Sequence, residues 1–409
     1  MDLNCLNKQE LLEQFNKLKK ISLKIDMTRG KPSKEQLDLS LPMMDVLNSD
    51  SNYLDESGVD VRNYGKLDGI EECKKLIASM AEVSPENVII FGNSSLEIMY
   101  ECIANAFLHG VCGSTPWSKL NKIKWLCPVP GYDRHFAMLE HLGIEMINIP
   151  MKDDGPDMDL VEELVKDPEV KGIWCVPKYS NPSGITYSKE VVERFAKLRP
   201  SAKDFRIYWD NAYNLHHLYE DKQDSIPELL SFAKKFNNED IVYKFVSTSK
   251  ISFPGSGVAA LIASKKNLDD VKSHLKYKTI GYDKVNQLRH VRYFKDLDGL
   301  KLQMKKHAEI IRPKFELVEN YLENNLKGLV KWTKPLGGYF ISLYVPSKAT
   351  EVILMCKECG VTLTEAGCAY PYHKDPTNSH IRLAPTYVEL DELKKAMEVI
   401  CLCVKICIC

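Results

Sequence analysis

Two side chains near the middle of the sequence have the types and settings for carbonyl chemistry. The first, Lys250, follows an apolar run and lies among hydroxyl residues, in Val246-Ser247-Thr248-Ser249-Lys250, with no carboxylate beside it. Burial would lower the pKa of this amine and leave it free to form a Schiff base with an aldehyde cofactor. Taken alone, Lys250 could also be an ordinary exposed loop lysine.

The second is Asp210, which closes the apolar run Arg206-Ile207-Tyr208-Trp209-Asp210. A carboxylate buried at the end of a strand requires a partner, and a protonated pyridine nitrogen would be one. Holding that proton makes the ring an electron sink for a substrate carbanion. The alternative for Asp210 is the N-cap of a helix, where aspartate is favoured.

A phosphate site is predicted at Gly92-Asn93-Ser94-Ser95, which precedes the helix-like run Leu96-Glu97-Ile98-Met99-Tyr100. Backbone N–H groups and hydroxyls at the start of a helix suit an anion. An ordinary helix cap is the alternative. The Asn-Ser-Ser triplet is also a glycosylation sequon, which we discount because the N-terminus does not resemble a secretory signal.

Alternating helix and strand patterns from about residue 66 predict an α/β fold, in which short apolar runs form a mostly parallel seven-stranded sheet. The predicted strands are 88–92, 123–127, 146–149, 172–176, 206–209, 241–246 and 258–263. Polar, turn-forming residues follow several of them. In open α/β sheets ligands bind beyond the carboxyl ends of the strands, so these turns are expected to converge on one crevice.

Three parts of the chain differ in pattern. Residues 1–45 form an N-terminal arm with one helix and the turn Thr28-Arg29-Gly30-Lys31-Pro32-Ser33, and residues 46–290 form the large domain. Residues 291–409 begin with a long helical stretch and continue with shorter helices and strands. This predicts a smaller α+β domain at the C-terminus.

The charge balance argues against several classes of protein. The 55 Lys and Arg residues against 56 Asp and Glu give a net charge of -1, which lacks the basic excess of a nucleic-acid or membrane-surface binder. No apolar run approaches the length of a membrane span, and charged residues interrupt the first 20 positions. These patterns predict a cytoplasmic protein.

Cysteine spacing suggests no metal site. The 13 cysteines are odd in number and most lie singly in apolar runs, which favours reduced core thiols. Cys356 and Cys359 fall on a helix-like stretch, and no second pair completes a tetrahedral site. The four cysteines between Cys401 and Cys409 are interpreted as part of an apolar terminal segment.

Together these residues resemble the fold-type I enzymes that depend on pyridoxal 5'-phosphate, in particular the class I aminotransferases of the aspartate aminotransferase branch. The resemblance covers essentially the whole chain, and its strength lies in seven motifs that occur in the family's order. They are Asn63-Tyr64-Gly65, Gly92-Asn93-Ser94-Ser95, Gly131-Tyr132, Asn181-Pro182-Ser183-Gly184, Asp210 with Tyr213, Ser247 with Lys250, and Ile381-Arg382-Leu383.

The resemblance implies a role for each matched residue. Lys250 would bind the cofactor aldehyde and carry a proton between the substrate and the cofactor, and Asp210 would pair with the ring nitrogen. Around the ring, Asn181 and Tyr213 would contact the 3-oxygen and Tyr132 would stack on one face. The phosphate would be held by Ser94, Ser95, Ser247 and Ser249, joined by Tyr64 from the partner subunit of a homodimer. Arg382 would clamp the substrate carboxylate beside Gly30.

One departure lies downstream of Lys250. Relatives usually carry an arginine there that pairs with the phosphate, whereas Phe253-Pro254-Gly255-Ser256-Gly257-Val258 offers only a serine. The phosphate would then depend on hydroxyls, backbone amides or a base distant in the sequence. The glycines of this segment also imitate a dinucleotide fingerprint, but they lead into a strand and not a helix.

The resemblance implies amino transfer in two half-reactions of a ping-pong mechanism, with aspartate and 2-oxoglutarate as first choice. A dicarboxylate needs a second cation, for which Arg29, Lys31, Lys178, Arg289 and Arg292 are candidates. Two alternatives stay open: a lyase or decarboxylase that uses the same cofactor, and a non-catalytic regulator with an aminotransferase-like ligand domain.

Overall fold

The computed structural model describes residues 8–408 as helices and strands that alternate along most of the chain. The helices are α1 (Lys8–Ile21), α2 (Lys34–Asp38), α3 (Glu71–Ala81), α4 (Ser95–His109), α5 (Asp133–His141), α6 (Met158–Leu164), α7 (Lys189–Lys197), α8 (Leu229–Lys234), α9 (Lys265–Lys278), α10 (Lys284–Phe294), α11 (Leu297–Leu326), α12 (Ala349–Glu358) and α13 (Leu390–Ile408). Short 3-10 helices include η2 (Leu41–Asp45) and η6 (Pro254–Ser256).

The strands form one large and two small sheets. They are β1 (Ile25–Asp26), β2 (Val88–Ile90), β3 (Lys124–Val129), β4 (Glu145–Lys152), β5 (Gly155–Pro156), β6 (Val170–Cys175), β7 (Arg206–Asp210), β8 (Val242–Ser247), β9 (Ala259–Ala263), β10 (Lys331–Trp332), β11 (Ile341–Tyr344), β12 (Val361–Thr362) and β13 (His380–Leu383). The large sheet has the order β2-β9-β8-β7-β6-β3-β4-β5.

The predicted α/β class is confirmed, and all seven predicted strands lie in the large sheet. The pairs β3 with β4, β3 with β6, β6 with β7 and β7 with β8 are parallel. Only β9 runs against its neighbours among the long strands, because it returns directly from the turn after β8. The two-residue strand β5, which was not predicted, pairs antiparallel with the end of β4 and makes the sheet eight-stranded.

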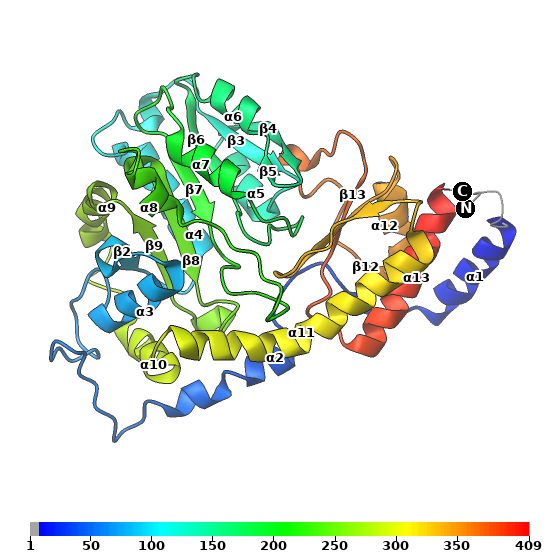
Figure 1. Cartoon of the computed structure of the whole chain (residues 1–409), viewed down its shortest axis with the longest axis horizontal. Helices are drawn as coiled ribbons and strands as arrows, with labels where there is room; N and C mark the ends of the chain where they lie inside the picture. Colours follow the sequence, from blue (N-terminus) through cyan, green and yellow to red (C-terminus); the bar gives the residue numbers. More distant parts are fainter. Residues whose placement is uncertain (1–7, 409) are drawn as a thin grey trace.

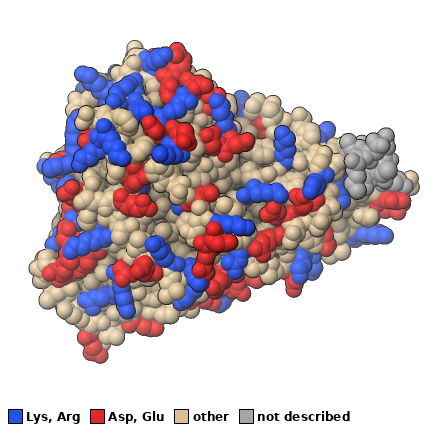
Figure 2. Space-filling model, in the orientation of Figure 1, with Lys and Arg blue, Asp and Glu red and all other residues tan. Residues whose placement is uncertain are grey.

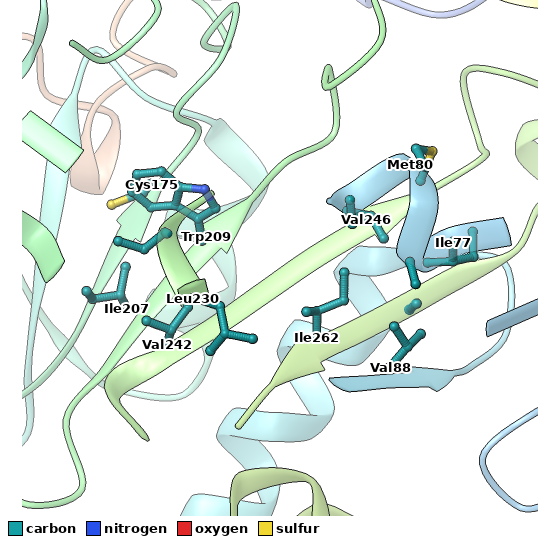
Figure 3. Packing of buried hydrophobic residues seen from close by; sticks show 14 of the residues in the cluster. Ile77, Met80, Val88, Cys175, Ile207, Trp209, Leu230, Val242, Val246 and Ile262 are labelled. Carbon is teal, nitrogen blue, oxygen red and sulfur yellow. The ribbon is translucent and has the colours of Figure 1, made fainter. Parts of the chain in front are cut away.

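Helices cover the faces of this sheet because its strands are apolar on both sides, as expected for parallel strands. On one face, Ile77 and Met80 of α3 pack toward β2, β8 and β9, and Leu230 of α8 packs near β7 and β8 (Figure 3). The buried rings of Trp125, Trp174 and Tyr208 lie in a separate cluster, which includes residues of α4. Apolar side chains of the sheet are therefore buried in two separate clusters.

A second core lies beyond the large sheet and is reached by the 30-residue helix α11 (Figure 1). Leu300 and Met304 of α11 pack into the core beside the large sheet, whereas Ile311 and Val318 pack into the second core. Helix α1 packs on α13 there, and β1 pairs with β12, so residues near the N-terminus join the C-terminal part. The boundaries at residues 45 and 290 stay a prediction, and residues 1–7 of the arm lie outside the described residues.

The surface carries Lys and Arg interspersed with Asp and Glu on the face shown in Figure 2. Within residues 8–408, no helix is long and apolar enough to cross a membrane. Cys356, Cys359, Cys401 and Cys403 are buried free thiols in α12, at its C-terminal end or in α13, while Cys409 lies outside the described residues. Residues 8–408 contain no cluster of three or more His, Cys, Asp or Glu side chains that could hold a metal ion.

Candidate active site

The predicted site residues meet where the parallel strands end. Strand β6 lies between β3 and β7, while β4 follows β3 on the opposite side, so the order of the strands reverses direction between β3 and β6. Such a reversal opens a crevice at the carboxyl ends of the strands. A cavity of about 430 Å³ lies there and is lined by seven predicted residues: Gly30, Tyr132, Asn181, Asp210, Tyr213, Lys250 and Arg382.

Lys250 lies in the turn after β8 and faces this cavity. Its Nζ atom lies 4.9 Å from the centre of the Tyr213 ring. Burial lowers the pKa of Lys250 from its ordinary value, and the Asp210 carboxylate partly opposes that shift. A lowered pKa gives the neutral amine that Schiff-base chemistry requires. The structure thus places Lys250 in the cavity and not in an exposed loop.

Asp210 is the last residue of β7 and is 5% exposed. Its Oδ2 atom lies 3.2 Å from Nε2 of His135, whereas its Oδ1 atom is buried with no hydrogen-bond partner among the described residues. Asp210 does not cap a helix, because the residues after it form turns. A buried carboxylate oxygen without a donor is costly, so a donor from a bound ligand fits this position.

His135, which the sequence analysis missed, supports both Asp210 and the ring face of the site. Its imidazole stacks on Trp174 with ring centres 4.2 Å apart and meets Tyr132 edge-on at 4.8 Å. The available signal was its position three residues after Tyr132, which places the two side chains on one face of a helical turn.

Two tyrosines flank the cavity as neutral phenols. Burial raises the pKa of Tyr132 to about 12 and raises that of Tyr213 well above its ordinary value. Both hydroxyls therefore keep their protons at neutral pH and can donate a hydrogen bond. Asn181 is 5% exposed, and its Oδ1 atom accepts a hydrogen bond from Nη1 of Arg382.

Arg382 lies in the middle of β13 and reaches the cavity from the C-terminal part of the chain. Its Nη1 atom is 3.3 Å from Oδ1 of Asp133, and its Nη2 atom donates to the carbonyl of Thr28 and the hydroxyl of Thr364. The Nε atom is buried and lacks a partner among residues 8–408. The guanidinium is thus fixed in place with one donor to spare.

Gly30 brings the N-terminal arm close to Arg382. A Cβ atom at this position would lie 2.4 Å from Cζ of Phe340, a distance that side chains do not tolerate. The Phe340 ring in turn lies 5.0 Å from the Arg382 guanidinium. A larger residue at position 30 would force the buried Phe340 ring to move, so glycine suits a chain that passes directly against this ring.

The serines predicted for the phosphate lie at the edge of the site, and none is among the described residues that line the cavity. Ser94 is the N-cap residue of α4, yet its side chain makes no cap hydrogen bond, and Ser95 begins the helix. Ser247 ends β8, and Ser249 donates to the carbonyl of Asn93. Ser94, Ser95 and, through Asn93, Ser249 therefore lie at or next to the start of α4, where helix N–H groups suit an anion.

The cations suggested for a second carboxylate separate into two groups. Arg29 and Lys31 line the cavity, joined by Arg134, which the sequence analysis did not single out. The other three are engaged elsewhere: Nζ of Lys178 donates to the carbonyl of Asn214, Arg289 donates to Ser256, and Arg292 donates to the carbonyl of Asn52.

This fold, with a lysine and an aspartate facing one cavity at the strand ends, defines a pyridoxal-phosphate-dependent transferase of fold type I. The crystal structure of an α-aminoadipate aminotransferase from Thermus thermophilus, complexed with N-(5'-phosphopyridoxyl)-L-leucine, has a TM-score of 0.75 at 18% identity. The matched region spans 97% of this chain and 94% of the Thermus thermophilus chain. The predicted fold type is confirmed.

The family model described as aspartate amino-transferase matches residues 4–408, and the chain belongs to this family. The aspartate aminotransferase of Corynebacterium glutamicum is 44% identical over 97% of this chain and 92% of its own length. An aspartate transaminase crystal structure from that organism has a TM-score of 0.95 and 43% identity, covering 98% of this chain and 95% of its own. The protein is an aminotransferase that uses pyridoxal 5'-phosphate.

The described residues fit this cofactor. The unpaired Oδ1 of Asp210 would accept the proton of a pyridinium nitrogen, and the amine of Lys250 faces the same cavity. Hydroxyls and N–H groups at the start of α4 suit a phosphate.

Proposed function

We propose that this aminotransferase transfers the amino group of aspartate to 2-oxoglutarate in two alternating half-reactions. The observation that carries the proposal is the cavity's surplus of positive side chains. Besides Lys250, four cations and two carboxylates line it: Arg29, Lys31, Arg134 and Arg382 against Asp133 and Asp210. One arginine suffices for an α-carboxylate, so the remaining cations suit a side-chain carboxylate. Both proposed substrates are dicarboxylates, and the relative from Corynebacterium glutamicum bears the name aspartate aminotransferase.

Lys250 and Asp210 carry the chemical step of this proposal. When bound, pyridoxal 5'-phosphate supplies an aldehyde carbon and an electron-withdrawing ring. Lys250, whose pKa is lowered by burial, would act as the general base that takes the proton from the substrate α-carbon and as the acid that returns it. Asp210 would hold a proton on the ring nitrogen, and Nε2 of His135 lies 3.2 Å from its Oδ2 atom, where it limits the orientations open to the carboxylate.

The remaining predicted residues bind and orient. Asn181 and the neutral Tyr213 donate to the ring 3-oxygen, while Tyr132 stacks on the ring face. Arg382 binds the α-carboxylate through its planar fork, beside the glycine at residue 30. The α-carboxylate takes over the interaction that Asp133 makes with Nη1 in the free site.

Ser94, Ser95, Ser247 and Ser249 hold the phosphate, and Tyr64 of a second copy of the chain completes this end in a homodimer. Tyr64 is 80% exposed, and the carbonyl of the next residue, Gly65, lies close to Gly281, which follows the exposed Ile280. Native mass should show a dimer, and Tyr64→Phe should weaken cofactor binding. A monomer with full cofactor affinity would contradict this part of the proposal.

The experiment that tests the substrates is a screen of amino donors against 2-oxo acids with the purified holoenzyme. Aspartate with 2-oxoglutarate should exceed alanine or phenylalanine in kcat/KM by about 100-fold, since one buried charge-assisted pair contributes roughly 1.5–3 kcal/mol. Double-reciprocal plots of the initial rate against the aspartate concentration, at several concentrations of the acceptor, should be parallel lines, as a ping-pong mechanism requires. Equal use of neutral amino acids, or release of ammonia or carbon dioxide without conversion of the 2-oxo acid, would overturn the assignment.

Variants separate the two carboxylate sites. Arg382→Lys should raise KM about 10- to 100-fold for every amino acid alike, because it removes the bidentate contact. Arg29, Lys31 and Arg134 are each changed to Gln in turn. Replacing the cation that binds the side-chain carboxylate should raise KM for aspartate and leave KM for alanine unchanged. The control is Arg62→Gln, since Arg62 is exposed and pairs with Asp60 away from the cavity.

A further inference from the structure

Arg289 is a half-buried cation with no acidic partner. The structure records no ion pair for it among residues 8–408. Its Nη2 atom donates to Oγ of Ser256 at 2.6 Å and to Oδ1 of Asn286 at 2.5 Å. Its Nε atom is buried and has no hydrogen-bond partner in the same part of the chain. Its Nη1 atom contacts Sδ of Met44 at 3.4 Å, so the guanidinium has only neutral partners and one buried donor unused, an arrangement that suits a bound anion.

The helix η6, which Arg289 contacts, is linked by hydrogen bonds to the serines at the edge of the site. Ser249 donates to the carbonyl of Asn93, and Nδ2 of Asn93 donates to the carbonyl of Pro254, the first residue of η6. At the other end of η6, Ser256 receives the guanidinium of Arg289. One hydrogen-bonded chain therefore connects the start of α4, the turn before Lys250 and helix α10.

Gly257 leaves the space beside this turn without a side chain. A Cβ atom at residue 257 would lie 3.2 Å from the backbone nitrogen of Ser249. Instead, Nδ2 of Asn286 donates to the carbonyls of Ser256 and Gly257 and attaches α10 to the segment. No cation can therefore come from residue 257, and the described cation bonded to the segment comes from α10.

We infer that Arg289 supplies the positive charge that binds the phosphate of pyridoxal 5'-phosphate, 39 positions beyond Lys250 in the sequence. A phosphate ester carries close to two negative charges at neutral pH, and serine hydroxyls with helix N–H groups contribute only partial charges. The Nε atom of the guanidinium is an unused donor. The hydrogen bond from Nη2 to Ser256 holds the guanidinium against η6, the short helix that follows the turn with Ser249.

The test compares cofactors with and without the phosphate. Apoenzyme of the wild type and of Arg289→Gln is titrated with pyridoxal 5'-phosphate and, separately, with pyridoxal, following the visible absorption band. We expect the dissociation constant for pyridoxal 5'-phosphate to rise about 10- to 100-fold and that for pyridoxal to stay within about twofold. Phosphorus NMR of the bound cofactor should show protonation of the phosphate at a higher pH in the variant.

The matched control is Arg292→Gln, which removes the same charge from the same helix at an exposed residue that contacts the Asn52 carbonyl. It should leave both affinities unchanged. Arg289→Lys should recover part of the phosphate-dependent affinity, and circular dichroism with thermal unfolding checks that each variant folds.

Equal losses for pyridoxal and its phosphate would assign Arg289 a purely structural role and overturn the inference. Unchanged cofactor affinity with a raised KM for dicarboxylates would also overturn it, since Arg289 would then bind substrate. These affinities are measured without any amino acid, so the inference can fail or hold whether or not aspartate is the substrate.

Discussion

The two ends of the active site differ in how they are built. The end that faces Asp210 and Lys250 is enclosed: Asp210, Asn181 and Tyr213 are each at most 5% exposed and come from neighbouring strand ends of one sheet. The end at Ser94 and Ser249 lies outside the cavity lining, and its aromatic candidate Tyr64 is 80% exposed.

The difference indicates where the protein can vary. Groups that set the protonation of the reacting atoms lie in a low-dielectric interior, where their pKa values and orientations depend on many contacts. The phosphate only anchors the cofactor, so any suitably placed cation can serve, and the chain supplies one from α10. We therefore expect changes at the enclosed end to reduce turnover, and changes at the open end to reduce cofactor affinity.

The largest effect is expected for Lys250→Ala. The variant should fold as the wild type does, but lose at least about 1,000-fold in kcat, since it lacks both the nucleophile and the general base. The visible absorption band of the bound cofactor should shift as well. Retention of both the band and the activity would show that another amine does this work and would remove the basis of the comparison.

A loss of about 100- to 1,000-fold in kcat is expected for Asp210→Asn, because the ring nitrogen would no longer keep its proton. The matched variant His135→Gln keeps the carboxylate and removes only the imidazole 3.2 Å from it, so it should cost no more than about 10-fold. If the two variants lose the same amount, Asp210 acts only through its contact with His135. Single-turnover kinetics at saturating cofactor measures both.

The residues of the enclosed end could be predicted from the sequence, and serines were also proposed for the open end, whereas the contact of Arg289 with Ser256 could not be predicted. Tyr132, Asn181, Asp210 and Lys250 all follow strand runs that are apolar on both sides, and parallel strands place such residues at one edge. His135 was missed because its role depends on contact with β6 and β7, which no local pattern reports.

The contact between Ser256 and Arg289 joins residues on η6 and α10, and it depends on how α10 packs over the turn. Likewise, the contact of Gly30 with Phe340 joins the two ends of the chain. Periodicity and turn signals describe neighbours in sequence, so contacts of this kind follow only from the assembled structure.

The smallest expected effect concerns His290, which contacts Thr248 and Ser252 in the turn that carries Ser249 and Lys250. Its Nε2 atom lies 2.8 Å from Oγ of Ser252 and 3.2 Å from Oγ1 of Thr248, and its Nδ1 atom lies 2.8 Å from the Asn286 carbonyl. These contacts suit a neutral imidazole that donates from Nδ1 and accepts at Nε2. Burial lowers the pKa of His290 to about 4, with the Asn286 carbonyl partly opposing.

The lowered pKa predicts an acid-sensitive stability. The histidine has a pKa of 6.5 in the unfolded chain and of about 4 in the folded chain. Between these two pH values the unfolded chain is protonated at residue 290 and the folded chain is not, so the free energy of unfolding falls as the pH drops. The slope from this one group is about 1.4 kcal/mol per pH unit. The destabilisation caused by His290→Gln should therefore shrink by about 2 kcal/mol from pH 7 to pH 5, measured by urea unfolding of the apoenzyme.

Ser252→Ala breaks a hydrogen bond of the same imidazole but removes no titratable group, so its cost in unfolding free energy should vary much less with pH. If both variants show the same pH dependence, His290 is not held neutral, and the turn that carries Lys250 must be fixed by other contacts.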